Sequence, residues 1–225
     1  MSKIALFHGS PIIVEKPLFG FGKVYNDYGQ GFYCTEHIEL AKEWACTDKS
    51  DGYVNEYEID LSGLRILNLS SLEYNILNWL AILMKNRLVN LSSPLSERAK
   101  QYLLDNFLPN YEEYDVIVGY RADDAYFLFA RAFISNQISL NQLKKAMRLG
   151  NLGEQYCLKS KRAFSQINFI KATQVDSEKY YSLKKQRDTN AREEYNQESQ
   201  NDDINGLFMR DIILEGIKNG DQRLR

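Results

Sequence analysis

The pattern of apolar and polar residues along the chain switches repeatedly between strand-like and helix-like spacing. Seven short segments are continuously apolar or alternate with a period of two, which is typical of strands. They are 3–7, 31–34, 53–59, 65–69, 115–119, 154–158 and 166–170. Helical spacing or capping residues mark six others: 35–45, 72–89, 93–107, 123–134, 139–150 and 207–217. Because strands and helices do not alternate strictly, the pattern predicts an α+β fold rather than a doubly wound sheet.

Local signals refine this picture at several boundaries. Glycine and proline interrupt the first apolar run, which predicts a strand over 3–7 with His8 at its end and a loop after it. The alternating segment 53–59 is expected to be half-buried, with 65–69 as its neighbour in the sheet. Thr35 is expected to cap the helix that comes after it.

The composition changes after Val175. Segment 177–203 has almost no large aliphatic residues and many charged ones, which predicts a solvated helix and then a loop. Segment 207–217 is amphipathic again and is expected to dock on the body of the protein or on a partner. We therefore predict one domain over 1–175 and a polar helical extension over 176–225.

The composition excludes several protein classes. The 225 residues are 44% hydrophobic and 26% charged, as in ordinary globular proteins, and the formal net charge is −2. That balance gives no polybasic signature for duplex nucleic acid or an anionic membrane. No apolar run reaches the ~18 residues that a membrane span needs, and the first residues lead into a strand-like segment, so we expect a cytoplasmic protein that does not contact membranes.

Metal binding is not expected either. The chain has two histidines, and its three cysteines, Cys34, Cys46 and Cys157, form no C-x-x-C pair. The cysteines are expected to be reduced thiols that pack as small hydrophobic residues. Motifs of P-loop proteins, kinases, serine hydrolases and zinc proteases do not occur in the sequence.

Two glycine-containing segments near the amino terminus are candidates for ligand binding. His8, followed by Gly9 and Ser10, could place an imidazole on the rim of a site, or could simply bond a local carbonyl group. In 27–35, two glycines precede an aromatic strand, so that Tyr33 could stack on a flat ring. A β-bulge with core aromatic residues is the alternative for that segment.

Two further segments carry charged or amide side chains. In 119–124, Arg121, Asp123 and Asp124 come directly after a buried strand, where they could bind a ligand or cap the next helix. Glu154 and Gln155 are adjacent on a predicted strand, so only one of them can face a given cleft. The pattern leaves open which one does, and a solvated edge strand remains an alternative.

Four segments in series resemble an uncharacterised bacterial family grouped with the ADP-ribosyltransferase superfamily, which includes diphtheria-toxin-like and poly(ADP-ribose)-polymerase-like enzymes. They are FHGS at 7–10, DYGQGFYCT at 27–35 with Trp44 and Ala45 behind it, GYRADDAYF at 119–127 and LGEQ at 152–155. The resemblance spans about residues 4–172. It implies a split antiparallel sheet around an NAD⁺ cleft, with inserted helices and a helical extension.

The resemblance also implies roles for individual residues. It assigns catalytic roles to His8, Tyr33 and Gln155, with His8 on a ribose hydroxyl and Tyr33 stacked on nicotinamide. It implies that NAD⁺, the substrate, is bound by these residues: His8, Gly9, Ser10, Gly31, Tyr33, Thr35, Arg121, Asp123 and Asp124. Many members of the superfamily have a glutamate at the position of Gln155, and a glutamine keeps the hydrogen bond but loses the charge.

The function implied by this resemblance is mono-ADP-ribosylation of a macromolecular acceptor, either a protein or a single-stranded nucleic acid. Other small members suggest a toxin of a toxin–antitoxin or phage-defence system, with an antitoxin protein as a partner. The alternatives are an NAD⁺ glycohydrolase and a catalytically silent module that binds NAD⁺ or a partner. The loss of charge at Gln155 makes the silent module credible.

Overall fold

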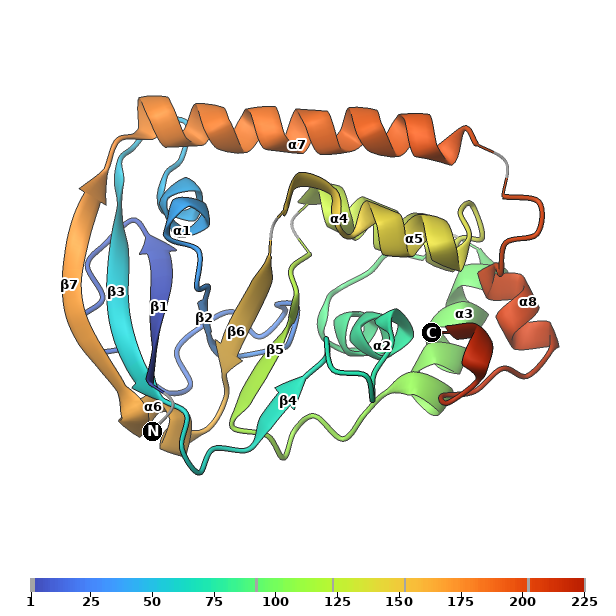
Figure 1. Cartoon of the computed structure of the whole chain (residues 1–225), viewed down its shortest axis with the longest axis horizontal. Coiled ribbons are helices and arrows are strands. Elements are labelled where there is room, and N and C mark those ends of the chain that lie inside the picture. Colours follow the sequence, from blue (N-terminus) through green and yellow to red (C-terminus); the bar gives the residue numbers. More distant parts are fainter. Residues whose placement is uncertain (1–2, 92, 123, 152, 202, 225) are drawn as a thin grey trace.

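Two β-sheets stand side by side in the computed structural model, which describes residues 3–91, 93–122, 124–151, 153–201 and 203–224 (Figure 1). The first sheet is antiparallel, with the strand order β1 (Lys3–Ser10), β3 (Gly52–Asp60), β7 (Ile167–Val175). The second has the order β2 (Phe32–Cys34), β6 (Glu154–Leu158), β5 (Val116–Tyr120), β4 (Ile66–Asn68). The fold is therefore α+β, as the sequence pattern predicts.

The two sheets meet at an isolated bridge between Phe7 of β1 and Thr35, just after β2. The Phe7 N–H donates to the Thr35 carbonyl at 2.7 Å, and the Thr35 N–H donates to the Phe7 carbonyl at 2.9 Å. Apart from this bridge, β1 pairs with β3 along its length, and β2 pairs with β6. The bridge thus fixes β1 beside β2 at the point where the two sheets separate.

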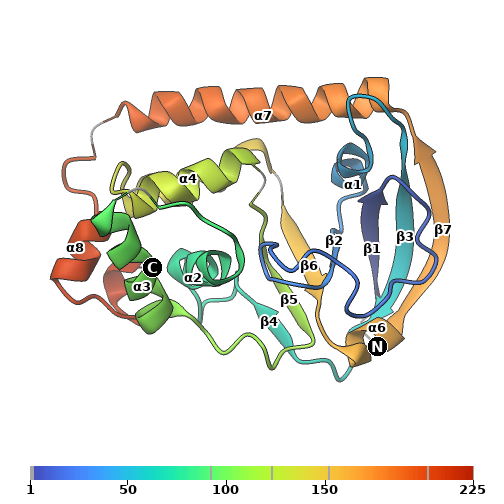
Figure 2. The ribbon, with the colours of Figure 1, turned by 180° about the vertical axis from the view of Figure 1, so that it is seen from behind.

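Helices pack against both sheets. They are α1 (Ile38–Ala45), α2 (Ile76–Asn86), α3 (Pro94–Phe107), α4 (Asp124–Ile134), α5 (Leu140–Ala146), α6 (Lys161–Gln166), α7 (Ser177–Ser199) and α8 (Met209–Leu214), with short 3-10 turns at Leu149–Asn151 and Gln222–Leu224. Helix α1 packs on β1 and β3, and the largest core cluster surrounds α2 beside β5 (Figure 2). Helix α2 is apolar around most of its circumference because it is buried among other helices.

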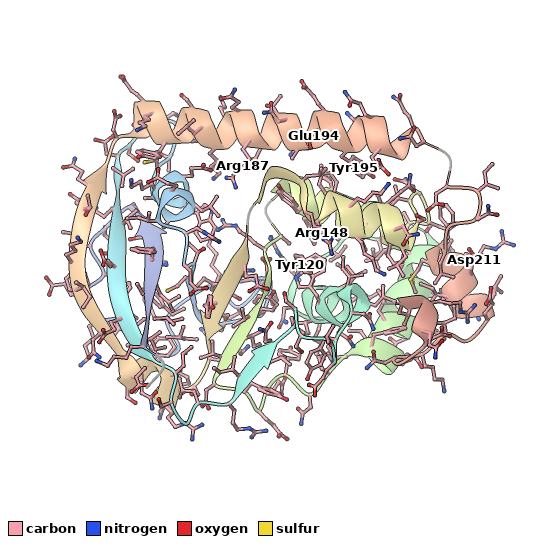
Figure 3. The ribbon with its side chains drawn as sticks, viewed as in Figure 1. Tyr120, Arg148, Arg187, Glu194, Tyr195 and Asp211 are labelled. Carbon is pink, nitrogen blue, oxygen red and sulfur yellow. The ribbon has the colours of Figure 1, made fainter. Side chains whose placement is uncertain are left out.

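The long helix α7 runs along one side of the molecule, from the end of β7 across α1 to α5 (Figure 1). It is mostly polar and buries Tyr180 and Ala191. Near its end, the Tyr195 ring stacks on Phe129 of α4 with 4.2 Å between ring centroids (Figure 3). Helix α8 buries Met209 and Ile212 in the main core. The segment after Val175 therefore packs on the body of the protein, and its separation as a domain stays a prediction.

Strand β7 extends to Val175, beyond the predicted 166–170, and two further strands differ from the sequence predictions. Strand β1 continues through His8 to Ser10, because these residues pair with Tyr53–Asn55 of β3. The segment 65–69 was expected beside 53–59, but β4 pairs in parallel with β5 in the other sheet. Local pattern cannot choose between neighbours, because pairing depends on the tertiary fold.

The helices also differ at their ends. Helix α1 begins after His37 rather than Thr35, although the Thr35 hydroxyl accepts the His37 N–H at 3.1 Å. Helix α2 is shorter than 72–89, because the capping box at Asn75 sets its start and Arg87 comes directly after its last turn. Between the predicted strands 154–158 and 166–170, the chain forms the short helix α6.

Further expectations concern membranes and cysteines. No helix among the residues described combines the length and apolarity required to cross a membrane. The three cysteines are buried thiols, and burial raises the pKa of Cys157 to about 12. They therefore pack as hydrophobic residues in the protonated form.

Candidate functional site

Two adjoining cavities open beside the junction of the sheets. The first has a volume of about 560 Å³ and the more polar lining of the two, and the second has a volume of about 570 Å³ and is mostly apolar. Both volumes lie in the usual range for ligand-binding sites. Six residues line both cavities: His8, Ser10, Pro11, Lys23, Asn26 and Tyr33. We call the first cavity the polar cleft and the second the apolar pocket.

His8 lies in β1 and is connected directly to Tyr33. Its Nδ1 atom lies 2.7 Å from the Tyr33 carbonyl oxygen, and a carbonyl can only accept, so Nδ1 carries a proton. Burial lowers the pKa of His8 below 6.5, against the opposing effect of this hydrogen bond. The imidazole is therefore neutral at pH 7, and its Nε2 is an acceptor for a hydroxyl group.

Gly9 contributes its backbone to the polar cleft. The N–H and C=O of Phe7 point to Thr35, and backbone groups along a strand alternate between its two edges, so those of Gly9 face the same side as those of Phe7. A Cβ atom at Gly9 would lie 2.0 Å from the Ala41 carbonyl oxygen of α1 and 2.7 Å from the Ala45 nitrogen. Glycine is thus required for α1 to pack this closely on β1.

Tyr33 lies in β2 and lines both cavities. Its hydroxyl donates to the Gly29 carbonyl at 2.6 Å and accepts the Tyr28 N–H at 3.0 Å. Burial is the main cause that raises the pKa of this phenol well above 10. The hydroxyl is therefore neutral and holds the preceding loop, which leaves the ring as the part of Tyr33 that a ligand can contact.

Gln155, rather than Glu154, faces the polar cleft from β6. It is 4% exposed, and its Nε2 donates to Asp27 Oδ2 at 2.8 Å and to the Tyr120 carbonyl at 3.2 Å. Glu154 lies on the opposite face of the strand, where its carboxylate accepts from the Ser70 hydroxyl. The structure thus resolves which of the two adjacent residues lies in the cleft.

Asp27 is a buried carboxylate in the wall of the polar cleft. Besides Gln155, it accepts the Ala122 N–H at 2.9 Å and the Arg87 Nε–H at 2.8 Å. Arg87 also donates to the Ala122 carbonyl. This Asp27 network joins the loop before β2, the end of α2, the segment after β5 and strand β6.

Arg121 lies in the same cleft, with its guanidinium carbon 3.2 Å from the centroid of the Trp44 ring of α1. The Trp44 Nε1 is buried, and none of the described residues accepts its hydrogen. Helix α7 closes this side of the cleft with Lys184 and Asp188. Next to them, Arg187 reaches from α7 to Glu43 of α1 in a buried ion pair (Figure 3).

Other predicted site residues have different positions. Gly31 lines the apolar pocket, but a Cβ there would lie 2.5 Å from the Cys157 sulfur, so its close backbone approach is to strand β6. Thr35 is fully buried and lines neither cavity, because its backbone and hydroxyl join the two sheets. Asp123 lies outside the described residues, as does the side chain of Asp124.

Basic groups outnumber acidic ones in the wall of the polar cleft, where Lys23, Arg87, Arg121 and Lys184 accompany two aspartates. A molecule carrying phosphate groups would be attracted to such a wall. Across the part of the chain that the structure describes, no group of three or more His, Cys, Asp or Glu side chains could hold a metal ion. The chemistry that the cleft suggests is the binding of a polar anionic ligand with an aromatic part.

Comparison with protein families gives a match over residues 4–169 to a family described as "Protein of unknown function (DUF3990)". The chain belongs to the DUF3990 family. No curated protein and no solved structure matches it. The DUF3990 match contains the strands that carry His8, Tyr33 and Gln155, whereas Lys184 and Asp188 of α7 lie beyond it.

Several residues that line the polar cleft are not predicted from the sequence. Asp27 stands at the start of the DYGQGFYCT segment, and Trp44 enters only as part of a motif. Arg87, Lys184 and Asp188 belong to no motif and reach the cleft only through the tertiary fold. The signal that could have identified Asp27 is a carboxylate next to a tyrosine and two glycines in a candidate binding segment.

Proposed function

We propose that this protein is an NAD⁺-dependent mono-ADP-ribosyltransferase that transfers ADP-ribose to a protein or nucleic-acid acceptor and releases nicotinamide. The observation that carries the proposal is that His8, Gly9, Tyr33 and Gln155 line one cleft although they come from three strands in two sheets. The division of the strands into two sheets joined by a bridge also agrees with an ADP-ribosyltransferase-like split sheet. The parallel β4–β5 pair departs from the antiparallel sheet that the resemblance implies; its paired residues do not line the cleft, whereas Arg121 and Ala122 just after β5 do.

The cleft offers a partner for each part of an NAD⁺ molecule. The Gly9 N–H and C=O can bond the carboxamide of nicotinamide, and the Tyr33 ring can stack on its pyridinium ring. The neutral His8 can accept a hydrogen bond from a ribose hydroxyl through Nε2. Arg121 and Lys184 can bind the phosphates.

The reaction breaks the bond between the ribose C1′ and the nicotinamide nitrogen, and the bonding electrons leave with neutral nicotinamide. The sugar develops oxocarbenium character, and a nucleophile of the acceptor forms a new bond to C1′ and loses its proton. Catalysis then consists of orienting NAD⁺ and stabilising the developing cation. Gln155 contributes an amide dipole, rather than a charge, to the stabilisation of the cation.

The acceptor and the biological setting rest on the family resemblance. We propose a macromolecular acceptor in the cytoplasm and a toxin–antitoxin or phage-defence context, with an antitoxin as partner. The closest alternative is an NAD⁺ glycohydrolase, in which water is the nucleophile. A silent module that binds NAD⁺ or a partner is favoured by one observation, the buried amide of Gln155 in place of a free carboxylate.

The proposal is tested by incubating the full chain with NAD⁺ labelled on the adenosine, with and without cell lysate. We expect nicotinamide release that depends on lysate and label attached to a macromolecule. A His8→Gln variant should lose at least tenfold in rate, while His37→Gln, which changes the other histidine, should not. Melting temperatures of both variants show whether they are folded.

Each other result has a distinct meaning. Nicotinamide release without lysate identifies a glycohydrolase. Binding of NAD⁺ by calorimetry without any nicotinamide release identifies a silent module. If NAD⁺ does not bind at millimolar concentration, the assignment of the cleft is wrong.

A further inference from the structure

The three hydrogen bonds accepted by Asp27 fix the position of its carboxylate. Oδ1 accepts from Arg87 Nε, and Oδ2 accepts from the Ala122 N–H and from Gln155 Nε2. Two of these donors, a guanidinium and a backbone amide, belong to elements that do not depend on position 155. Asp27 is therefore the fixed member of the pair, and Gln155 adjusts to it.

The surroundings of Gln155 allow only one orientation of its amide. The two groups to which Nε2 donates, the Asp27 carboxylate and the Tyr120 carbonyl, can only accept hydrogen bonds. The same carbonyl also accepts from the Tyr28 hydroxyl at 2.6 Å and the Trp79 Nε1 at 3.0 Å. Both hydrogens of the Gln155 amide are thus directed into the protein, and its carbonyl oxygen Oε1 is the atom that remains for a ligand in the cleft.

A glutamate at position 155 would meet the same acceptors without a hydrogen to donate. Its carboxylate would lie at hydrogen-bonding distance from the Asp27 carboxylate, and two carboxylates so close cannot both stay ionised without a large penalty. Burial increases this penalty, because Asp27 is 3% and Gln155 is 4% exposed. The absence of a glutamate is then a consequence of Asp27, whether or not the site catalyses a reaction.

We infer that Asp27 is a positioning residue that requires glutamine at position 155 and turns the Gln155 carbonyl oxygen toward the bound ribose. The inference rests on the proposed function for the ligand that Oε1 meets. In this arrangement the negative charge lies on Asp27, in the loop before β2. The group that the ligand contacts is the neutral carbonyl oxygen of Gln155. The pair Asp27–Gln155 replaces a single glutamate with two residues that depend on each other.

The test compares wild type with Gln155→Glu, Asp27→Asn and the double variant D27N/Q155E. Q155E should weaken NAD⁺ binding, measured by calorimetry at pH 8, at least tenfold and lower the melting temperature by about 5 °C. In D27N/Q155E, the Nδ2 that replaces Oδ2 can donate to the carboxylate introduced at position 155, but it no longer accepts the Ala122 N–H, so the double variant should recover only part of what Q155E loses. The double variant should therefore bind NAD⁺ at least threefold more tightly than Q155E and melt at a higher temperature.

The pH dependence of Q155E gives a second measure that does not require the double variant to fold. Once protonated, the carboxyl group introduced at position 155 can donate to Asp27, so the melting-temperature deficit of Q155E relative to wild type should shrink between pH 8 and pH 5. The matched control is Gln101→Glu, because Gln101 Nε2 also donates to an aspartate, Asp105, at 2.7 Å but on an exposed helix face. Q101E should stay within about 1 °C of wild type because water screens the pair.

Failure of the inference differs from failure of the proposed function. If Q155E binds NAD⁺ or releases nicotinamide as well as wild type, or if D27N/Q155E is no better than Q155E and the deficit of Q155E does not shrink at low pH, Asp27 does not set the residue at position 155. If wild type neither binds NAD⁺ nor releases nicotinamide, the proposed function fails. In that case the melting temperatures still decide whether Asp27 and Gln155 are coupled.

Discussion

The two sheets contribute to the polar cleft by different physical means. The sheet β1-β3-β7 presents backbone and an imidazole at an edge, and their position depends on the close packing of α1 on Gly9. The sheet β2-β6-β5-β4 presents side chains that are held by a buried network of charges around Asp27. Steric fit therefore sets one wall of the cleft, and paired polar groups set the other.

The largest effect is expected from a change at Gly9, in the wall formed by the sheet β1-β3-β7. Gly9→Ala would place a methyl group against two backbone atoms of α1, which cannot move aside as a flexible side chain could. We expect a loss of about 4 kcal/mol in the free energy of unfolding, measured with urea. Gly63→Ala is the control, since a Cβ at Gly63 meets nothing within 4 Å and only its positive φ is strained, which costs about 1 kcal/mol. Equal losses in both variants would show that close packing on α1 does not matter.

A smaller loss in the free energy of unfolding is expected when the Asp27 network is broken, in the wall formed by the sheet β2-β6-β5-β4. Arg87→Met leaves Asp27 buried without its cation, which should lower the free energy of unfolding by about 3 kcal/mol. This lies at the low end for buried pairs because the Arg87 side chain is 25% exposed. Arg65→Met, which breaks a pair with Glu113 in which both side chains are more than half exposed, should cost less than about 1 kcal/mol. A loss for R87M no larger than that for R65M would contradict a role of this network in stability.

The same division governs which site residues can be predicted from the sequence. His8, Tyr33 and Gln155 are recognisable because each lies in or beside a short strand with glycines nearby. Asp27 and Arg87 are sixty positions apart and meet only in the folded chain. Likewise β4 is recognisable as a strand, but its partner β5 lies fifty positions away, and local alternation carries no information on that choice.

Tyr33→Phe tests how the Tyr33 hydroxyl, which bonds the loop before β2, contributes to stability and to ligand binding. Loss of the hydroxyl leaves the buried Tyr28 N–H without its acceptor, and the expected loss in the free energy of unfolding is about 1.5 kcal/mol. Affinity for NAD⁺ should change less than about threefold, because the ring remains, whereas Tyr33→Ala should lose at least tenfold. The exposed Tyr25→Phe serves as a control that should change neither quantity. Equal affinities of Y33F and Y33A would rule out stacking on this ring.

The smallest effect concerns the protonation of His8. Its pKa in the folded protein is lowered by burial, so the unfolded chain takes up a proton near pH 6.5 while the folded protein does so only at lower pH. Its contribution to stability is therefore complete above pH 6.5 and is lost as the pH falls below it. The melting temperature of wild type should fall between pH 7 and pH 5 more steeply than that of His8→Asn. Parallel curves would contradict a buried neutral imidazole.

Helix α7 gives the cleft a boundary that does not coincide with the boundary of the family match. The match ends at residue 169, within β7, yet Lys184 and Asp188 complete the wall and Arg187 connects it to α1. A chain cut after Val175 would keep His8, Tyr33 and Gln155 but would leave the cleft open to water on the side that α7 closes. Two DUF3990 proteins with identical strands could therefore differ in the shape and charge of this cleft solely through the helix that succeeds the last strand.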